Sequence, residues 1–162
     1  MTVPDPSLSK ALFMAMEGTE SHVKTLNAVE GLSADHAGQK PGGVPHSIFQ
    51  LVNHLVYWQD MALVWLGGKT PRWPEHDPEG WPGGDRPKDQ AEWDALVARF
   101  RAGLESAMGQ VERDDMFTVR DRWAPVQMFR SIASHHSYHV GQIVLIRRML
   151  EAWPPPGGGD SW

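Results

Sequence analysis

Four segments of the chain carry apolar residues every three or four positions, the spacing that gathers them on one face of an α-helix. They are residues 7–29, 46–66, 89–112 and 125–152. We find no convincing β-strand pattern between them. Helices of this length bury their apolar faces most simply against one another, so we expect an all-α protein folded as a four-helix bundle.

The domain organisation follows from where these segments begin and end. A chain of 162 residues with 41% hydrophobic residues can bury one core, so we expect a single domain over residues 1–152. Pro6 and Ser7 are typical of a helix start, and Gly31 of a stop. Three prolines and three glycines follow Trp153 and cannot continue a helix, so residues 153–162 are predicted to be a Pro/Gly-rich tail.

The connection over residues 67–88 is unusually long for a compact domain. It is rich in Gly, Pro, Trp and charged residues and has no helical periodicity. Trp73 and Trp81 stand isolated in it, and such rings need cover from the bundle or from a second subunit.

Alternating helix directions would make segments 46–66 and 125–152 parallel. At 1.5 Å per residue, His54 and His135 would then lie at the same depth below one end. We expect Arg122 and Trp123 at the rim of that end, and the 67–88 connection at the opposite end.

Composition excludes several classes of function. The net charge is −5 and no basic stripe is present, which argues against nucleic-acid binding. The chain has no cysteine, so it can form neither a disulfide nor a thiolate metal site. No signal peptide and no apolar run of membrane-spanning length is evident, so we expect a soluble cytoplasmic protein without membrane contact.

Two histidines four residues apart, His135 and His139, lie on the apolar face of segment 125–152, in line with Ile132 and Ile143. Each could be a core histidine bonded to a backbone carbonyl or a Tyr hydroxyl. Two imidazoles on neighbouring turns, however, need several partners that an aliphatic core lacks, whereas one metal ion satisfies both. The spacing therefore indicates a metal site.

A third ligand must come from elsewhere in the chain. The candidate is His54, which lies in the strongly apolar run of segment 46–66. Three neutral imidazoles and a water suit zinc, nickel or a similar divalent ion. His136 lies at the edge of the same face and is interpreted as a supporting residue, although it could replace His135. His22 is interpreted as a core histidine.

Common hydrolytic motifs are missing. The position after His135 holds His136 where a zinc protease would carry Glu, and no Gly-Xaa-Ser-Xaa-Gly motif is present. A carboxylate base could come from Glu17, Asp60 or Asp121, but the sequence singles out none of them.

Two motifs together resemble the DinB/YfiT-like family of four-helix metalloproteins: the run from Ser47 to Leu55 and the run from His135 to Ile143. The resemblance implies a long crossover between helices 2 and 3, and a divalent metal bound by His54, His135 and His139. It also implies a relation to transferases and isomerases in which the metal activates a low-molecular-weight thiol.

We therefore expect a metal-dependent enzyme, a transferase or a related hydrolase, that acts on a small molecule and keeps one coordination position open. The alternative is a non-catalytic dimeric bundle with a structural metal or none. A fourth protein ligand would favour the alternative, whereas a cleft lined by Arg122, Trp123 and Tyr57 would favour the enzyme. A homodimer is expected and is compatible with both.

Overall fold

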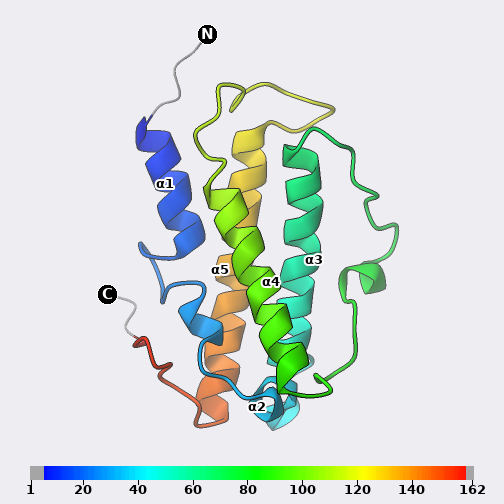
Figure 1. Ribbon diagram of the computed structural model, residues 1–162, viewed down its shortest axis with the longest axis vertical. Helices are drawn as coiled ribbons and strands as arrows, with labels where there is room; N and C mark the ends of the chain where they lie inside the picture. Colours follow the sequence, from blue (N-terminus) through cyan, green and yellow to red (C-terminus); the bar gives the residue numbers. More distant parts are fainter. Residues whose placement is uncertain (1–5, 160–162) are drawn as a thin grey trace.

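A computed structural model describes residues 6–159 of the protein, and this part of the chain is helical, without strands. Its α-helices are α1 (Pro6–Glu17), α2 (Ala34–Gly38), α3 (Ile48–Leu66), α4 (Gln90–Met108) and α5 (Pro125–Met149). The four long helices form the bundle, and α2 is a short turn at one end (Figure 1). The prediction of an all-α bundle is confirmed. Residues 1–5 of the predicted domain and 160–162 of the predicted tail lie outside the described residues.

No helix in the described part of the chain combines the length and the apolar composition needed to cross a membrane.

Helices α1 and α5 run in one direction, and α3 and α4 run in the other (Figure 1). Two contacts show that α3 and α5 run in opposite directions. The side chain of Arg120, shortly before α5, donates to the carbonyl of Trp65 at the end of α3. At the opposite end, Met149 packs against Gly42, shortly before α3. The expectation that these two helices run parallel is therefore wrong.

The reason is the crossover, residues 67–89, which runs along the side of α3 and returns the chain to the end where α3 began (Figure 1). A helix of the length of α3 spans roughly 28 Å, which a fully extended chain covers in about nine residues. The crossover is long enough to make this return with residues to spare. The expectation that it lies at one end of the bundle is wrong, whereas the long crossover itself is present.

The first helix is shorter than predicted, because α1 ends at Glu17 rather than near residue 29. Gly18 has a φ of 90°, and a side chain there would lie 2.7 Å from the ring of His22. The chain turns at this glycine, and the apolar residues beyond it continue in turns and a short 3-10 helix, Asn27–Val29.

A single serine both starts α3 and anchors the crossover. The Ser47 hydroxyl accepts a hydrogen bond from the backbone N–H of Gln50, whose side chain accepts in return from the backbone N–H of Ser47. The same hydroxyl donates to the carbonyl of Asp85 at 2.5 Å. The Gln50 amide donates to the Asp85 carboxylate at 3.0 Å, so the end of the crossover is held against the start of α3.

The core consists of two hydrophobic clusters stacked along the bundle. On α5, one cluster contains Met128, Phe129, Ile132 and Ala133, and the other contains Val140, Ile143 and Ile146. His135 and His139 fall between them, at the level where the apolar packing of α5 is interrupted.

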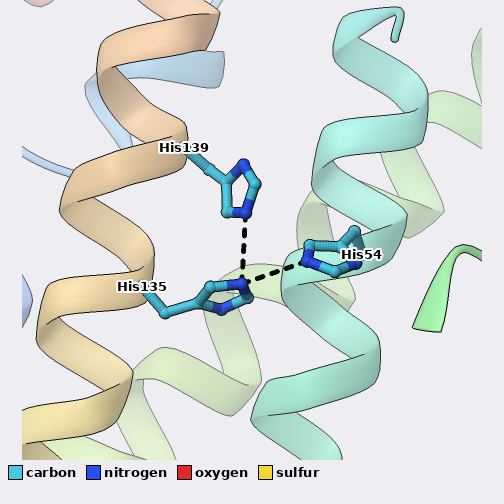
Figure 2. A group of neighbouring side chains, drawn as sticks. All are labelled: His54, His135 and His139. Carbon is cyan, nitrogen blue, oxygen red and sulfur yellow. Dashed lines mark hydrogen bonds between the residues drawn. The ribbon is translucent and has the colours of Figure 1, made fainter. Parts of the chain in front are cut away.

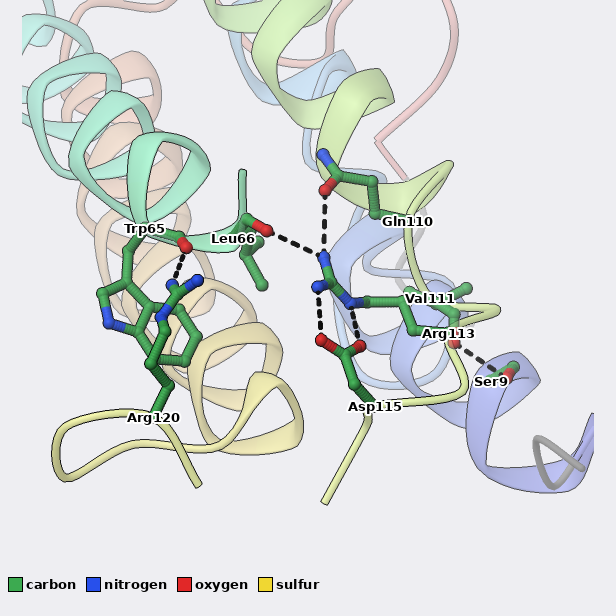
Figure 3. A network of polar contacts seen from close by, with 8 residues as sticks. All are labelled: Ser9, Trp65, Leu66, Gln110, Val111, Arg113, Asp115 and Arg120. Atoms are coloured by element: carbon green, nitrogen blue, oxygen red, sulfur yellow. Dashed lines mark hydrogen bonds and ion pairs between the residues drawn. The ribbon is translucent and has the colours of Figure 1, made fainter. Parts of the chain in front are cut away.

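Polar contacts fix the loop between α4 and α5 against the end of α3 (Figure 3). Arg113 donates two hydrogen bonds to the Asp115 carboxylate, at 2.7 and 2.8 Å, and a third to the carbonyl of Leu66 at 3.0 Å. The guanidinium of Arg120 lies 4.1 Å above the ring of Trp65. The loop is thereby held in place where it enters α5.

Candidate metal centre

Three imidazoles converge between α3 and α5 (Figure 2). His54 projects from α3, and His135 and His139 project from successive turns of α5. The Nε2 atom of His135 lies 3.1 Å from Nε2 of His54 and 3.1 Å from Nε2 of His139. One ring nitrogen from each of the three lies within 4.8 Å of the others. The structure thus brings together the three histidines that the sequence singled out.

The outer nitrogens of two rings are held by acceptors. Nδ1 of His54 lies 2.6 Å from the carbonyl of Gly80, and Nδ1 of His139 lies 2.7 Å from Oε1 of Gln142. A carbonyl oxygen only accepts, so each Nδ1 carries the proton, and each neutral ring then presents a lone pair at Nε2. This is the form in which an imidazole binds a metal.

The convergence of these nitrogens fits a cation better than a hydrogen bond. If Nε2 of His135 carried a proton, that single proton would face the lone pairs of both His54 and His139. A metal ion accepts all three lone pairs at once. Tetrahedral zinc with Zn–N bonds of about 2.0–2.1 Å separates its ligand nitrogens by about 3.3–3.4 Å. The 3.1 Å separations lie close to that value.

Burial keeps the three rings neutral. Desolvation, followed by the neighbouring histidines, lowers the pKa of His135 to about 4. Desolvation also lowers the pKa of His139 to about 4, and it lowers the pKa of His54. The rings are therefore neutral at neutral pH, and no imidazolium has to lose a proton before a metal binds.

The crossover covers the outer side of His54. The ring of Trp81 stacks on His54 at a centroid distance of 3.9 Å, and His46 stacks on Trp81, also at 3.9 Å. Gly80, whose carbonyl holds His54, lies so close to Trp58 that a side chain on it would stand 3.1 Å from the indole nitrogen. The expectation that isolated tryptophans of the crossover need cover is confirmed for Trp81, which docks on the bundle. The stacking of Trp81 on His54 was not predicted, because the crossover has no helical periodicity from which its position against α3 could be inferred.

A pocket of about 440 Å³ adjoins the histidines. It lies between α3, the crossover and the start of α5, and His135 is part of its wall. The wall includes the indoles of Trp58, Trp73 and Trp123. Of the cleft predicted from the sequence, Arg122 and Trp123 line this pocket, whereas Tyr57 is not among its lining residues.

His136 and His22 lie outside the group of three histidines. His136 is 1% exposed, lies in the pocket wall and packs edge-on against Phe100, outside the histidine group, so it does not replace His135. Burial lowers its pKa to about 3. His22 has partners for both ring nitrogens, the Ser137 hydroxyl at 2.8 Å and the carbonyl of Val23 at 2.7 Å. It links the turn that follows α1 to α5 as an internally bonded histidine.

The carboxylates considered as bases lie elsewhere. Glu17 pairs with Lys24, and Asp60 pairs with Arg99. Asp121 is exposed and has a φ of 58°. No acidic side chain of the described residues lines the pocket.

A helical bundle with three converging imidazoles beside an aromatic pocket has the architecture of a metal-binding protein. The family model of the DinB superfamily matches residues 19–143, which include all three histidines, and the chain belongs to this superfamily. The fold is similar to that in the crystal structure of a conserved protein from Enterococcus faecalis, with a TM-score of 0.60 and 16% identity over 93% of this chain and 99% of that chain. No curated protein matches the chain.

Proposed function

We propose that the protein is a divalent-metal-dependent enzyme that acts on a small molecule. His54, His135 and His139 hold the ion, and its open coordination position faces the pocket. The proposal is carried by one observation: His135 belongs both to the histidine group and to the pocket wall. Neutral imidazole ligands suit zinc or nickel.

A bound ion supplies Lewis acidity, which brings the pKa of a water or thiol at the open position toward neutrality. The chain's own residues prepare this position. Gly80 and Gln142 hold the Nδ1 protons of two ligands, and Trp81 excludes water from the outer side of His54. Because the chain has no cysteine, a thiol nucleophile would come from a low-molecular-weight thiol. The reaction class we propose is a thiol-dependent transfer or a related hydrolysis or isomerisation.

The composition of the histidine group favours an enzyme over a closed structural metal site. Structural zinc sites normally use four protein ligands. Among the described residues, the group contains three histidines and no fourth His, Asp or Glu.

Metal analysis of the purified protein tests the ligands. Wild type is expected to hold one equivalent of zinc or nickel after loading, and His135→Ala and His139→Ala are expected to lose it. His76→Ala, which removes an exposed crossover histidine, is the matched control and should keep the metal. Stoichiometric metal in both ligand variants would exclude this site.

Cobalt substitution tests the open position. Addition of 2-mercaptoethanol to the cobalt-loaded protein should produce a sulfur-to-cobalt charge-transfer band. A spectrum unchanged by the thiol would contradict a thiol-accepting open position while leaving the three histidine ligands in place.

We also propose that the protein forms a homodimer through α5. Three large apolar side chains recur along one exposed face of this helix: Tyr138 at 65% exposure, Leu145 at 57% and Met149 at 44%. Such a stripe is unfavourable in water unless it is covered. Light scattering should give the mass of a dimer for wild type and of a monomer for Leu145→Glu, and a monomeric wild type would contradict the proposal.

A further inference from the structure

The pocket is bordered by an exposed arginine that has no ion-pair partner among the described residues. Arg122 lines it and contacts the ring of Trp123 at 5.8 Å, but it forms no ion pair with any described residue. Arg99 and Arg113, by contrast, each pair with an aspartate. Since no described acidic side chain lines the pocket, an anionic group entering it would find its counterion at Arg122.

The indoles provide a surface for a flat ligand. Trp73 and Trp123 are each 37% exposed, although both belong to the pocket wall, and Trp58 adds a third ring. Partly exposed indoles in a concave wall are best covered by an aromatic or other flat apolar group.

Two buried polar atoms in residues of the same wall have no partner. Nε2 of Gln59 donates to the carbonyl of Phe100 at 3.2 Å, but Oε1 of Gln59 accepts from no described group. Nδ1 of His136 is likewise buried and unpaired. Gln59 and His136 are each 1% exposed. An unpaired buried polar atom is unfavourable, and if the Gln59 side chain turns toward the pocket, a hydrogen-bonding substituent on a ligand can supply the missing partner.

We propose that this pocket binds a small aromatic carboxylate that carries a hydroxyl group. The carboxylate pairs with Arg122, the ring packs against the indoles, and the hydroxyl group donates to Oε1 of Gln59 after this side chain turns toward the pocket. These contacts do not depend on a metal. The inference rests on the proposed function only where it takes the bound molecule to lie close to the metal.

The test uses calorimetric titration of the full-length protein kept metal-free with a chelator. The probe is 6-hydroxy-2-naphthoate, and the neutral comparison is 6-hydroxy-2-naphthamide. The carboxylate should bind about fivefold or more tightly than the amide in wild type, and Arg122→Gln should abolish this preference. Arg130→Gln, which removes an exposed charge on α5 outside the pocket wall, should retain it.

A second variant tests the hydroxyl contact. Gln59→Leu should remove the preference of wild type for 6-hydroxy-2-naphthoate over 2-naphthoate while leaving the effect of Arg122 unchanged.

Equal binding of carboxylate and amide, or an Arg122→Gln variant with unchanged carboxylate affinity, would overturn the inference. Carboxylate binding that arises only after zinc is added would also overturn it, because the anion would then bind the ion and not Arg122, and the proposed function would stand. Because the main titration is done without metal, a failure of metal loading leaves its result unaffected.

Discussion

The geometry of His54 and His139 depends on single acceptors at their outer nitrogens. One acceptor, the Gly80 carbonyl, belongs to the backbone and cannot be removed by a simple substitution. The other is the side chain of Gln142, one turn from His139 on the same helix. This difference makes Gln142 the residue through which ligand orientation can be tested.

Gln142→Leu is expected to weaken metal binding about 10- to 100-fold, because His139 loses the acceptor that fixes its tautomer and ring orientation. Gln142→Glu keeps an acceptor and should bind at least as tightly as wild type. Competition with a chromophoric chelator measures both affinities. Equal metal affinities for wild type and for both Gln142 variants would show that the 2.7 Å contact between Gln142 and His139 does not orient the His139 ring.

The metal-free protein is expected to lose stability as the pH falls from about 6.5 toward 4. The pKa values of His135 and His139 are about 4 in the folded protein, whereas an unfolded histidine titrates near 6.5. The unfolded state therefore binds more protons in this window. The free energy of unfolding is highest above pH 6.5 and decreases as the pH falls, by at most about 1.4 kcal/mol per pH unit for each histidine.

Urea titrations of chelator-treated protein at successive pH values measure this slope. The double variant His135→Ala, His139→Ala should have a shallower slope, and the exposed-site control His76→Gln should match wild type. A wild-type slope no steeper than that of the double variant would show that His135 and His139 do not cause this loss of stability.

At the scale of the helices, periodicity predicted three of the four long segments to within a few residues. Residues 46–66, 89–112 and 125–152 correspond to α3, α4 and α5, because an amphipathic face and a capping residue are local properties. The first helix was overestimated, since apolar residues continue at helical spacing beyond Gly18 although the chain turns there. The relative direction of α3 and α5 was wrong because it depends on the path of the crossover, which no local pattern encodes.

A buried arginine joins the end of α5 to the short 3-10 helix that follows α1. Arg147 is 2% exposed, and its guanidinium donates to the carbonyls of Ala28 and Glu30, each at 2.9 Å, and to that of Ala152 at 2.9 Å. The guanidinium thus supplies donors that these carbonyls would otherwise lack.

Arg147→Met should destabilise the protein by on the order of 3 kcal/mol, because the side-chain stem is retained while buried carbonyls lose their donors. The neighbouring Arg148 is exposed, and Arg148→Met is the matched control, expected to have little effect. Urea unfolding monitored by circular dichroism compares the two variants. Similar losses for both would mean that the buried hydrogen bonds of Arg147 are not what stabilises this junction.

At the scale of the whole molecule, the histidine group joins two antiparallel helices, and His54 and His135 are 81 residues apart in the chain. A metal at 100 times its dissociation constant adds about 2.7 kcal/mol to the stability of the folded state. For a domain of this size that corresponds to a rise in Tm of about 5–10 °C. Thermal unfolding with added zinc or with a chelator measures the rise.

His139→Ala should unfold at the same temperature with and without zinc. A zinc-dependent rise in this variant would place the stabilising ion elsewhere in the protein.

The histidine group was foreseeable because the spacing of His135 and His139 and the apolar setting of His54 are visible in the sequence. Its surroundings were not, since Gly80, Trp81 and Trp73 lie in a segment without periodicity. Gln59 looks in the sequence like an ordinary helical residue, and only the packing of α3 against α4 shows that it is buried.

His54 and His139 are 8% and 5% exposed, and Trp81 covers one of them, whereas His135 borders the 440 Å³ pocket. Under the proposed function, a metal ion and a small molecule would both approach the histidines from the side of this pocket. Under the same proposal, a molecule bound in the pocket would therefore slow the exchange of the ion.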